Sequence, residues 1–136
     1  MKLVFADTGY WIALLDRKDS YHQKALELKE YLKRAHIVTS QMVITELLAD
    51  ASSAGAYMRQ LTVQAVRRFS NSPGITIIPQ TNKLFTQAFN LYATVPDKQW
   101  SLTDCASFEI MRSKGIIQAL AHDKHFKQAG FVPLLR

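Results

Sequence analysis

The chain has 136 residues, of which 48% are hydrophobic and 21% are charged, and this composition is that of an ordinary globular domain. The values exclude disordered, collagen-like and disulfide-stapled classes, and the length predicts one domain with its own core. Seventeen Lys and Arg against 11 Asp and Glu give a net charge of +6, so the surface attracts polyanions such as nucleic acids. Acidic residues are scarce on this background, and their positions carry the most information about function.

The chain carries no signal for export or for a membrane. A lone cysteine, Cys105, cannot form an internal disulfide, which fits a reducing compartment. No apolar run approaches the about 20 residues that span a bilayer. Asp7 interrupts the apolar N-terminal stretch, and no small-residue cleavage pattern follows it. We therefore expect a cytoplasmic protein.

The first half of the chain alternates strand and helix patterns. The apolar run KLVFA is typical of a strand buried on both faces of a parallel sheet. Ser20 and Ser40 are the expected N-caps of the second and third helices. The predicted elements are a strand at 2–6, helices at 10–15 and 21–34, a strand at 36–39, and helices from 41 to about 53 and at 56–69.

The second half continues the alternation. Pro133 cannot donate to an interior strand ladder, so the terminal strand is expected at an edge. The predicted elements are a strand at 75–78, helices at 82–92 and 103–113, a strand at 116–121, a short helix at 124–129 and the edge strand at 131–135. This order predicts a single α/β domain over residues 1–136, with a mostly parallel sheet of four to five strands flanked by helices.

Four acidic residues fall at related places in this fold. Asp7 directly follows the first strand, Asp123 follows the fourth, and Asp104 opens the helix before that fourth strand. Glu46 lies within a helix, at the border of its apolar stripe. Ligands of open α/β sheets bind beyond the carboxyl ends of the strands. We therefore expect the four carboxylates to share one cleft.

Each acid alone has a simpler explanation. Asp7 and Asp123 suit helix N-caps, and Asp104 has the capping-box spacing from Ser101. Glu46 suits a solvated helix flank. Together, however, these acids stand at strand and helix ends, whereas most of the others lie among lysines and turns. Clustered carboxylates need compensation, because like charges raise one another's pKa.

A divalent cation supplies that compensation. Hard oxygen ligands, with no His or Cys expected among them, favour Mg²⁺ or Mn²⁺ over zinc. Such a cation can hold a phosphate, activate a water molecule and stabilise the leaving oxygen of an in-line displacement. An anionic metal site within a cationic surface is expected of a phosphodiesterase that acts on nucleic acid.

Four short motifs, in this order, resemble one known family. They are VFADTG at 4–9 followed by YWI, ITELL at 44–48, SLTDC at 101–105, and AHDKHF at 121–126 running into AGF at 129–131. With this spacing the chain resembles the PIN-domain ribonucleases over essentially its whole length, including the toxins of VapBC-type toxin–antitoxin pairs. Where some relatives carry a further acidic residue one turn after the third carboxylate, this chain has Ser107 and Phe108.

The resemblance implies a metal site, a substrate and partners. The ligands of the cation would be the acidic quartet Asp7, Glu46, Asp104 and Asp123, with the Thr8 hydroxyl beside them. Family members cut single-stranded RNA, or RNA at exposed loops, with Mg²⁺ or Mn²⁺, and commonly form homodimers. A cognate antitoxin is a further partner that the resemblance implies.

Other side chains near the quartet are candidates for contacts with RNA. The candidate substrate contacts are Thr8, Arg112, Lys124, His125 and Lys127. Trp100 lies in a polar loop, where it is placed to stack on a base or to bury in a dimer seam. Cys105 is expected in the core without a chemical role.

The leading hypothesis is a metal-dependent ribonuclease that hydrolyses RNA phosphodiester bonds at a four-carboxylate site, acting as the toxin of a type II toxin–antitoxin pair. The alternative is a PIN-fold module with a weak or inactive site that binds RNA or protein. Receiver domains and haloacid-dehalogenase-like phosphatases fit less well, because Asp7 is followed by Thr8 and Gly9 rather than by a second nearby acid.

Overall fold

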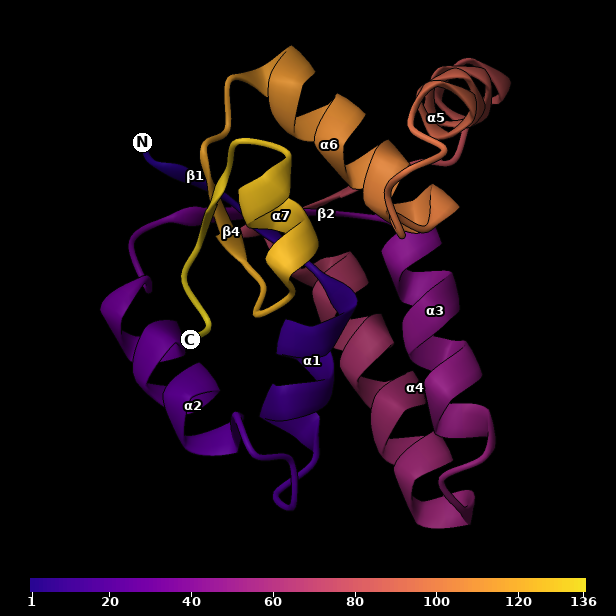
Figure 1. Ribbon diagram of the computed structural model, residues 1–136. Helices are drawn as coiled ribbons and strands as arrows, with labels where there is room; N and C mark the ends of the chain where they lie inside the picture. The colour runs from indigo at the N-terminus through magenta and orange to yellow at the C-terminus, as the bar shows by residue number, and fades with distance from the viewer.

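Five parallel strands form the centre of the computed structural model, which describes residues 1–136 (Figure 1). Their order across the sheet is β3-β2-β1-β4-β5, and each neighbouring pair runs parallel. The strands are β1 (Leu3–Ala6), β2 (His36–Ser40), β3 (Ile75–Ile78), β4 (Gln118–Leu120) and β5 (Val132–Pro133). The predicted parallel α/β sheet is confirmed, and the strand that contains Pro133 lies at an edge as expected.

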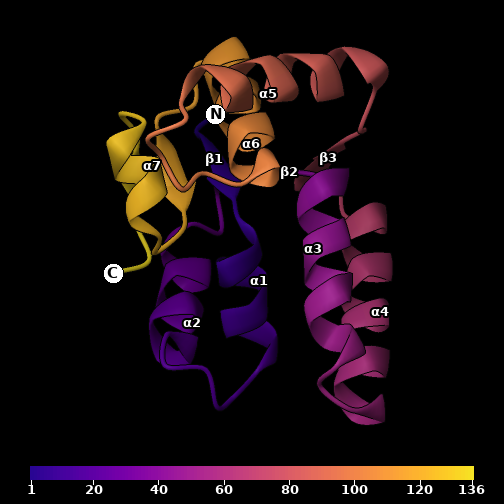
Figure 2. The same ribbon diagram turned by 45° about the vertical axis from the view of Figure 1, so that its right-hand side comes forward.

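Seven helices surround the sheet. They are α1 (Thr8–Leu15), α2 (His22–Tyr31), α3 (Gln41–Ser52), α4 (Ala56–Asn71), α5 (Asn82–Thr94), α6 (Leu102–Lys114) and α7 (Lys124–Gln128). Figure 2 shows α1 with α2, and α3 with α4, as two pairs that extend from the same end of the sheet. The helices α5 and α6 pack together at the other side of the domain. No helix is both long enough and apolar enough to cross a membrane.

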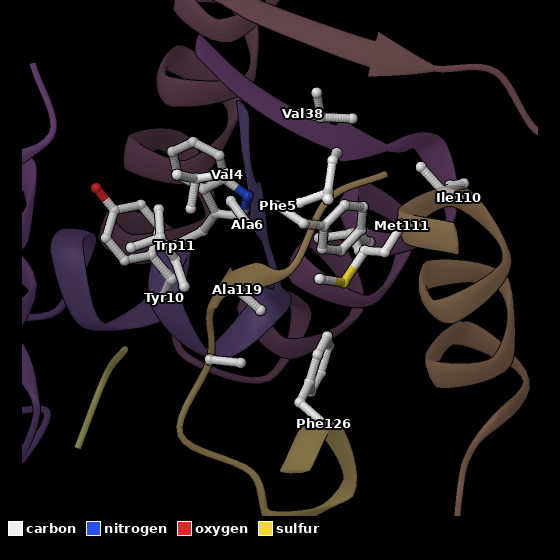
Figure 3. Packing of buried hydrophobic residues seen from close by; sticks show 14 of the residues in the cluster. Val4, Phe5, Ala6, Tyr10, Trp11, Val38, Ile110, Met111, Ala119 and Phe126 are labelled. Carbon is white, nitrogen blue, oxygen red and sulfur yellow. The ribbon is translucent and has the colours of Figure 1, made fainter. Parts of the chain in front are cut away.

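The core lies on both faces of β1. Val4, Phe5 and Ala6 are fully buried, which explains why the run KLVFA lacks the alternation of a half-exposed strand. Around them packs a cluster of 27 buried hydrophobic residues, part of which is drawn in Figure 3. In that cluster Phe108 of α6 meets Phe126 of α7 edge to face, with ring centroids 5.0 Å apart. The helices that precede and follow β4 are thereby fixed to one another.

Two helix starts were predicted from serine caps, and only one is correct. Ser40 caps α3, because its side chain accepts a hydrogen bond from the Val43 backbone N–H. Ser20 does not cap α2, which begins only at His22. Instead, Oδ1 of Asp19 accepts a hydrogen bond from the Tyr21 backbone N–H at 2.9 Å, forming a side-chain turn just before the helix.

The fourth strand is shorter than predicted. Its ladder covers residues 118–120, because Ile116 still bonds back to the Met111 carbonyl at the end of α6. Gly115 makes this reversal possible with a φ of 67°, in the left-handed region that favours glycine. The predicted stop of the helix at Gly115 is therefore confirmed.

Trp100 corrects an expectation from the sequence. Its side chain is 7% exposed, contacts Phe108 edge-on at 4.9 Å, and donates from Nε1 to Oε1 of Gln128 at 3.0 Å. The loop position suggested an exposed ring, but the fold covers this loop with α6 and α7. Trp100 therefore joins the start of α6 to the end of α7 and offers no face to an RNA base.

Trp100→Ala should lower the free energy of unfolding by about 3 to 5 kcal/mol, because it leaves a large cavity and an unpaired Gln128 amide. Thermal and urea unfolding measure this loss. The matched control is Tyr57→Ala on α4, where the ring is 76% exposed and little change is expected. An unchanged midpoint for Trp100→Ala would contradict the core position.

Candidate metal centre at the carboxyl ends of the strands

Asp7 lies where the two central strands end together. Its backbone N–H donates to the Leu120 carbonyl at 3.1 Å, so the end of β1 is tied to the end of β4. Asp7 occupies the N-cap position of α1, but its side chain makes no capping hydrogen bond. Capping therefore does not explain the carboxylate of Asp7, which is free for another role.

Asp104 and Asp123 do cap helices, as their positions predicted. Asp104 completes the capping box of α6, since its Oδ2 accepts from the Ser101 N–H at 3.0 Å. Asp123 caps α7, and its Oδ1 accepts from the His125 N–H at 3.0 Å. Each cap uses one oxygen. The second oxygens, Oδ1 of Asp104 and Oδ2 of Asp123, take part in no hydrogen bond within the protein.

His125 lies between these two carboxylates. Its Nδ1 is 3.0 Å from Oδ2 of Asp104 and 3.2 Å from Oδ1 of Asp123. Its side chain is 15% exposed, so the contact is largely shielded from solvent. His125 thus faces inward to the carboxylates through Nδ1.

Glu46 reaches the same region from α3. It accepts a hydrogen bond from the hydroxyl of Thr8, the first residue of α1, with 2.8 Å between Oγ1 and Oε1. Thr8 is buried, so its hydroxyl holds one rotamer of the glutamate. This contact joins α3 to the residue next to Asp7.

The four acids form one electrostatic cluster. The pKa of Asp7 is raised to about 7, mainly by burial and also by the charges of Asp104, Glu46 and Asp123, while a backbone hydrogen bond from Thr8 opposes the shift. The pKa of Asp104 is also raised, first by burial, although the Ser101 amide and His125 oppose the shift. The four acids that the sequence singled out are therefore near enough to influence the pKa of Asp7, while only Asp104 and Asp123, with His125, have ligand atoms within 4.8 Å of one another.

No Lys or Arg neutralises this cluster. The ion pairs of the chain join Lys33 to Glu30, Lys98 to Asp97 and Arg112 to Glu109, all at the surface. Only His125 contacts any of the four site acids at salt-bridge distance. In a chain of net charge +6 this absence is informative, because a cation from solution can take the place that lysine leaves.

The donor set fits a hard divalent cation. One ligand atom each of Asp104, Asp123 and His125 lie within 4.8 Å of one another. Opposite oxygens around Mg²⁺ or Mn²⁺ lie about 4.2 Å apart, from ligand distances of about 2.1 Å. Asp7 and Glu46 have no ligand atom in this group, so holding one cation with all four acids requires their side chains to move toward Asp104 and Asp123. The two oxygens of Asp104 and Asp123 that are free of hydrogen bonds are available to a cation.

Of the other candidate contacts with RNA, two lysines lie beside the acidic cluster and the arginine does not. Lys124 and Lys127 are exposed on α7, next to Asp123. Arg112 lies two turns along α6 from Asp104, 3.9 Å from Glu109 and over the Phe131 ring, so the structure does not bring it to the cluster. Ser107, which stands where some relatives carry an acid, is fully buried and donates to the Thr103 carbonyl.

Cys105 has no chemical role in this arrangement. The pKa of its thiol is raised to about 11, mainly by burial and in part by the charge of Asp104. A thiol with this pKa stays protonated at neutral pH and is a poor nucleophile. The expectation of a core cysteine is confirmed.

A ring stack at the edge of the cluster was not predicted from the sequence. The Tyr21 and His122 rings lie parallel, with centroids 4.3 Å apart and 7° between their planes. Nε2 of His122 comes so close to Gly9 that an added Cβ would lie 2.9 Å from it. This close approach explains why a glycine stands in the motif DTG. Gly9 was the one residue in the sequence that could have indicated it.

Asp7→Asn should stabilise the protein in EDTA at pH 8. Between the unfolded pKa of 3.8 and the folded value of about 7, the folded state binds more protons. The free energy of unfolding then falls as pH rises through this window. Above pH 7 the ionised Asp7 carboxylate destabilises the folded protein by up to about 4 kcal/mol. Thermal unfolding should show a higher midpoint for the variant at pH 8 and a much smaller difference at pH 4.

Asp50→Asn is the matched control for this measurement, because Asp50 is exposed on α3 outside the cluster. It should leave the midpoint unchanged at both pH values. A lower midpoint for Asp7→Asn at pH 8, or an equal difference at both pH values, would contradict the electrostatic cost at Asp7.

Comparison with known proteins agrees with the architecture of the fold. The chain is 30% identical over 130 residues to the 23S rRNA-specific endonuclease VapC20 of Mycobacterium tuberculosis, covering 96% of each chain. The crystal structure of M. tuberculosis VapC20, described as a sarcin-ricin loop cleaving toxin, matches with a TM-score of 0.83 at 29% identity, over 95% of this chain and 96% of that one.

A more distant structure shares the fold alone. FitAcB from Neisseria gonorrhoeae matches with a TM-score of 0.61 at 15% identity, covering 96% of this chain and 94% of that one. The family model for the PIN domain matches residues 4–132, nearly the full chain. With this match and the similarity to VapC20, the chain belongs to the PIN domain family.

Proposed function

We propose that this protein is a metal-dependent ribonuclease that hydrolyses RNA phosphodiester bonds. The observation that carries the proposal is the cluster of Asp7, Glu46, Asp104 and Asp123, which no Lys or Arg neutralises. The similarity to an rRNA-specific endonuclease supports RNA as the substrate class. We also propose that the protein acts in the cytoplasm, which the similarity to an rRNA-specific endonuclease supports.

The four acidic residues of the cluster are the proposed ligands of Mg²⁺ or Mn²⁺. Asp7, Asp104 and Asp123 are the proposed ligands, and Glu46 binds directly or through water. A bound divalent cation supplies a Lewis acid and an activated water for displacement at phosphorus. Thr8 holds Glu46 in place through its hydroxyl, and the capping amides hold one oxygen of Asp104 and of Asp123.

The proposed substrate contacts surround this acidic centre. Lys124 and Lys127 are exposed beside Asp123, where ammonium groups can meet the phosphates that flank the cleaved bond. Thr8 and His125 lie inside the cluster and reach RNA only at the cleaved phosphate. Arg112 is more distant and can contact only RNA that extends along α6.

Removing one metal ligand should abolish RNA cleavage without unfolding the protein. Asp104→Asn keeps the capping geometry and loses the charge, so cleavage of a fluorescent RNA should fall by at least about 100-fold, in the range expected when transition-state charge stabilisation is lost. EDTA should abolish wild-type cleavage, and Mg²⁺ or Mn²⁺ should restore it.

Asp50→Asn is the control and should cleave at the wild-type rate, since Asp50 is exposed outside the cluster. Full activity of Asp104→Asn, or cleavage that EDTA does not affect, would contradict the proposal. A wild-type protein that binds RNA without cutting it under any metal would favour the alternative, a PIN-fold binding module.

We also propose two protein partners, an antitoxin and a second copy of the chain. The similarity to a protein described as a toxin supports the antitoxin. The second copy is supported by α5, where Phe85, Phe89 and Tyr92 are 43%, 54% and 50% exposed at spacings of four and three. The only charged residue of α5 is Lys83, so this face offers no charge to attract a charged partner and suits a symmetric contact.

A double substitution on this face, Phe85→Ser with Phe89→Ser, should convert a dimer to a monomer, because it removes the apolar area that association would bury. Light scattering after size-exclusion chromatography measures the mass. Tyr57→Ser on α4, a more exposed ring on another helix, should leave the dimer intact. A wild-type protein that stays monomeric at high micromolar concentration would contradict the second-copy proposal.

A further inference from the structure

We infer that His125 is a positioning residue, which holds the carboxylates of Asp104 and Asp123 at the separation that a divalent cation needs. The inference rests on the proposed metal site. It begins from one geometric fact: a single ring nitrogen, Nδ1, meets Oδ2 of Asp104 at 3.0 Å and Oδ1 of Asp123 at 3.2 Å. The two carboxylates come from different helices, α6 and α7, and His125 directly links their side chains.

The ring is held in this orientation by its own helix. His125 is the second residue of α7, and its backbone N–H donates to the same Oδ1 of Asp123 that its Nδ1 faces. The neighbouring Phe126 is fully buried against Phe108 of α6, so the turn that carries His125 is anchored to the helix that carries Asp104. The imidazole therefore has a fixed place between the two acids.

The chemistry favours an N–H donor over a metal ligand at this position. The two oxygens that face Nδ1 also accept backbone N–H groups, so they are committed to hydrogen bonds on the protein side. The remaining oxygens, Oδ1 of Asp104 and Oδ2 of Asp123, are left for the cation. Mg²⁺ prefers oxygen ligands, whereas imidazole suits softer metals. His125 thus acts on the cation through the carboxylates.

This arrangement also explains why the acids can stay close before a cation binds. Like charges at this spacing repel, and Nδ1 offsets the repulsion through its hydrogen bond with Asp104 and its close contact with Asp123. Without His125, each carboxylate keeps its capping hydrogen bond, but no side chain links Asp104 to Asp123. Binding a cation must then fix their separation, which weakens the affinity.

Direct measurement of Mn²⁺ binding by calorimetry tests this inference without reference to cleavage. His125→Phe keeps a ring and removes the donor, and affinity for Mn²⁺ should fall by about 10- to 100-fold, the range for second-shell partners of metal ligands. His125→Asn places an amide N–H near the position of Nδ1 and should recover most of the affinity. His125→Gln carries its amide one bond further out and should bind as weakly as the Phe variant.

The matched control is His36→Phe at the amino end of β2, far along the strand from the cluster, which should bind Mn²⁺ like the wild type. Circular dichroism checks that each variant is folded. If the Phe variant fails to fold, the comparison of Asn with Gln decides the question, because both side chains are polar amides that differ in reach.

Three outcomes would overturn the inference. They are wild-type affinity in His125→Phe or His125→Gln, no recovery in His125→Asn, and a loss confined to Mn²⁺ with Mg²⁺ binding unchanged. The last result would show that the ring nitrogen is itself a ligand. A wild-type protein that binds neither cation would instead refute the proposed metal site, so the two failures are distinguishable.

Discussion

Repulsion among four carboxylates at the end of a parallel sheet is the constraint around which this domain is arranged. Strands β1 and β4 are neighbours, and the hydrogen bond from Asp7 to Leu120 brings their carboxyl ends together. Acids that follow these strands must then meet. Burial and the surrounding charges raise the pKa of Asp7 to about 7, which is a cost to the fold at neutral pH. A site that destabilises its own domain is expected where function requires it.

The chain limits this cost with neutral donors and one histidine rather than with lysine or arginine. Backbone amides hold one oxygen of Asp104 and of Asp123, and the Thr8 hydroxyl holds Glu46. A lysine in the cluster would neutralise it permanently and occupy the place of a metal. Neutral donors orient the carboxylates and leave their charge available. The positive charge of the protein lies elsewhere, where it can attract a polyanion to the acidic centre.

Much of the fold and the composition of the acidic cluster could be predicted from the sequence. The runs KLVFA and ITII indicated buried strands, and Gly115 and Ser40 indicated helix ends, because each depends on local propensity or period. The four acids could be grouped because parallel strands place their carboxyl ends at one edge of the sheet. Grouping the four acids required only the order of the strands and helices along the chain.

What the sequence could not predict depends on contacts between distant segments. Trp100 is buried because its ring contacts Gln128 and Phe108. No pattern in the sequence near Trp100 predicts these contacts. His125 and Asp104 are 21 residues apart in the chain. The orientation of His125 toward Asp104 therefore depends on how α7 packs against α6. Ser20 failed as a cap because the neighbouring Asp19 formed a competing turn. In each case the tertiary arrangement decided between local options of similar energy.

Anomalous X-ray diffraction from crystals soaked in Mn²⁺ tests the central claim most directly, since it locates the cation without any assumption about activity. The account predicts a single strong peak within the cluster, bounded by the carboxylates of Asp7, Asp104 and Asp123 with Glu46 beside them. No peak in this cluster at saturating Mn²⁺, or binding only at other surface acids, would contradict it.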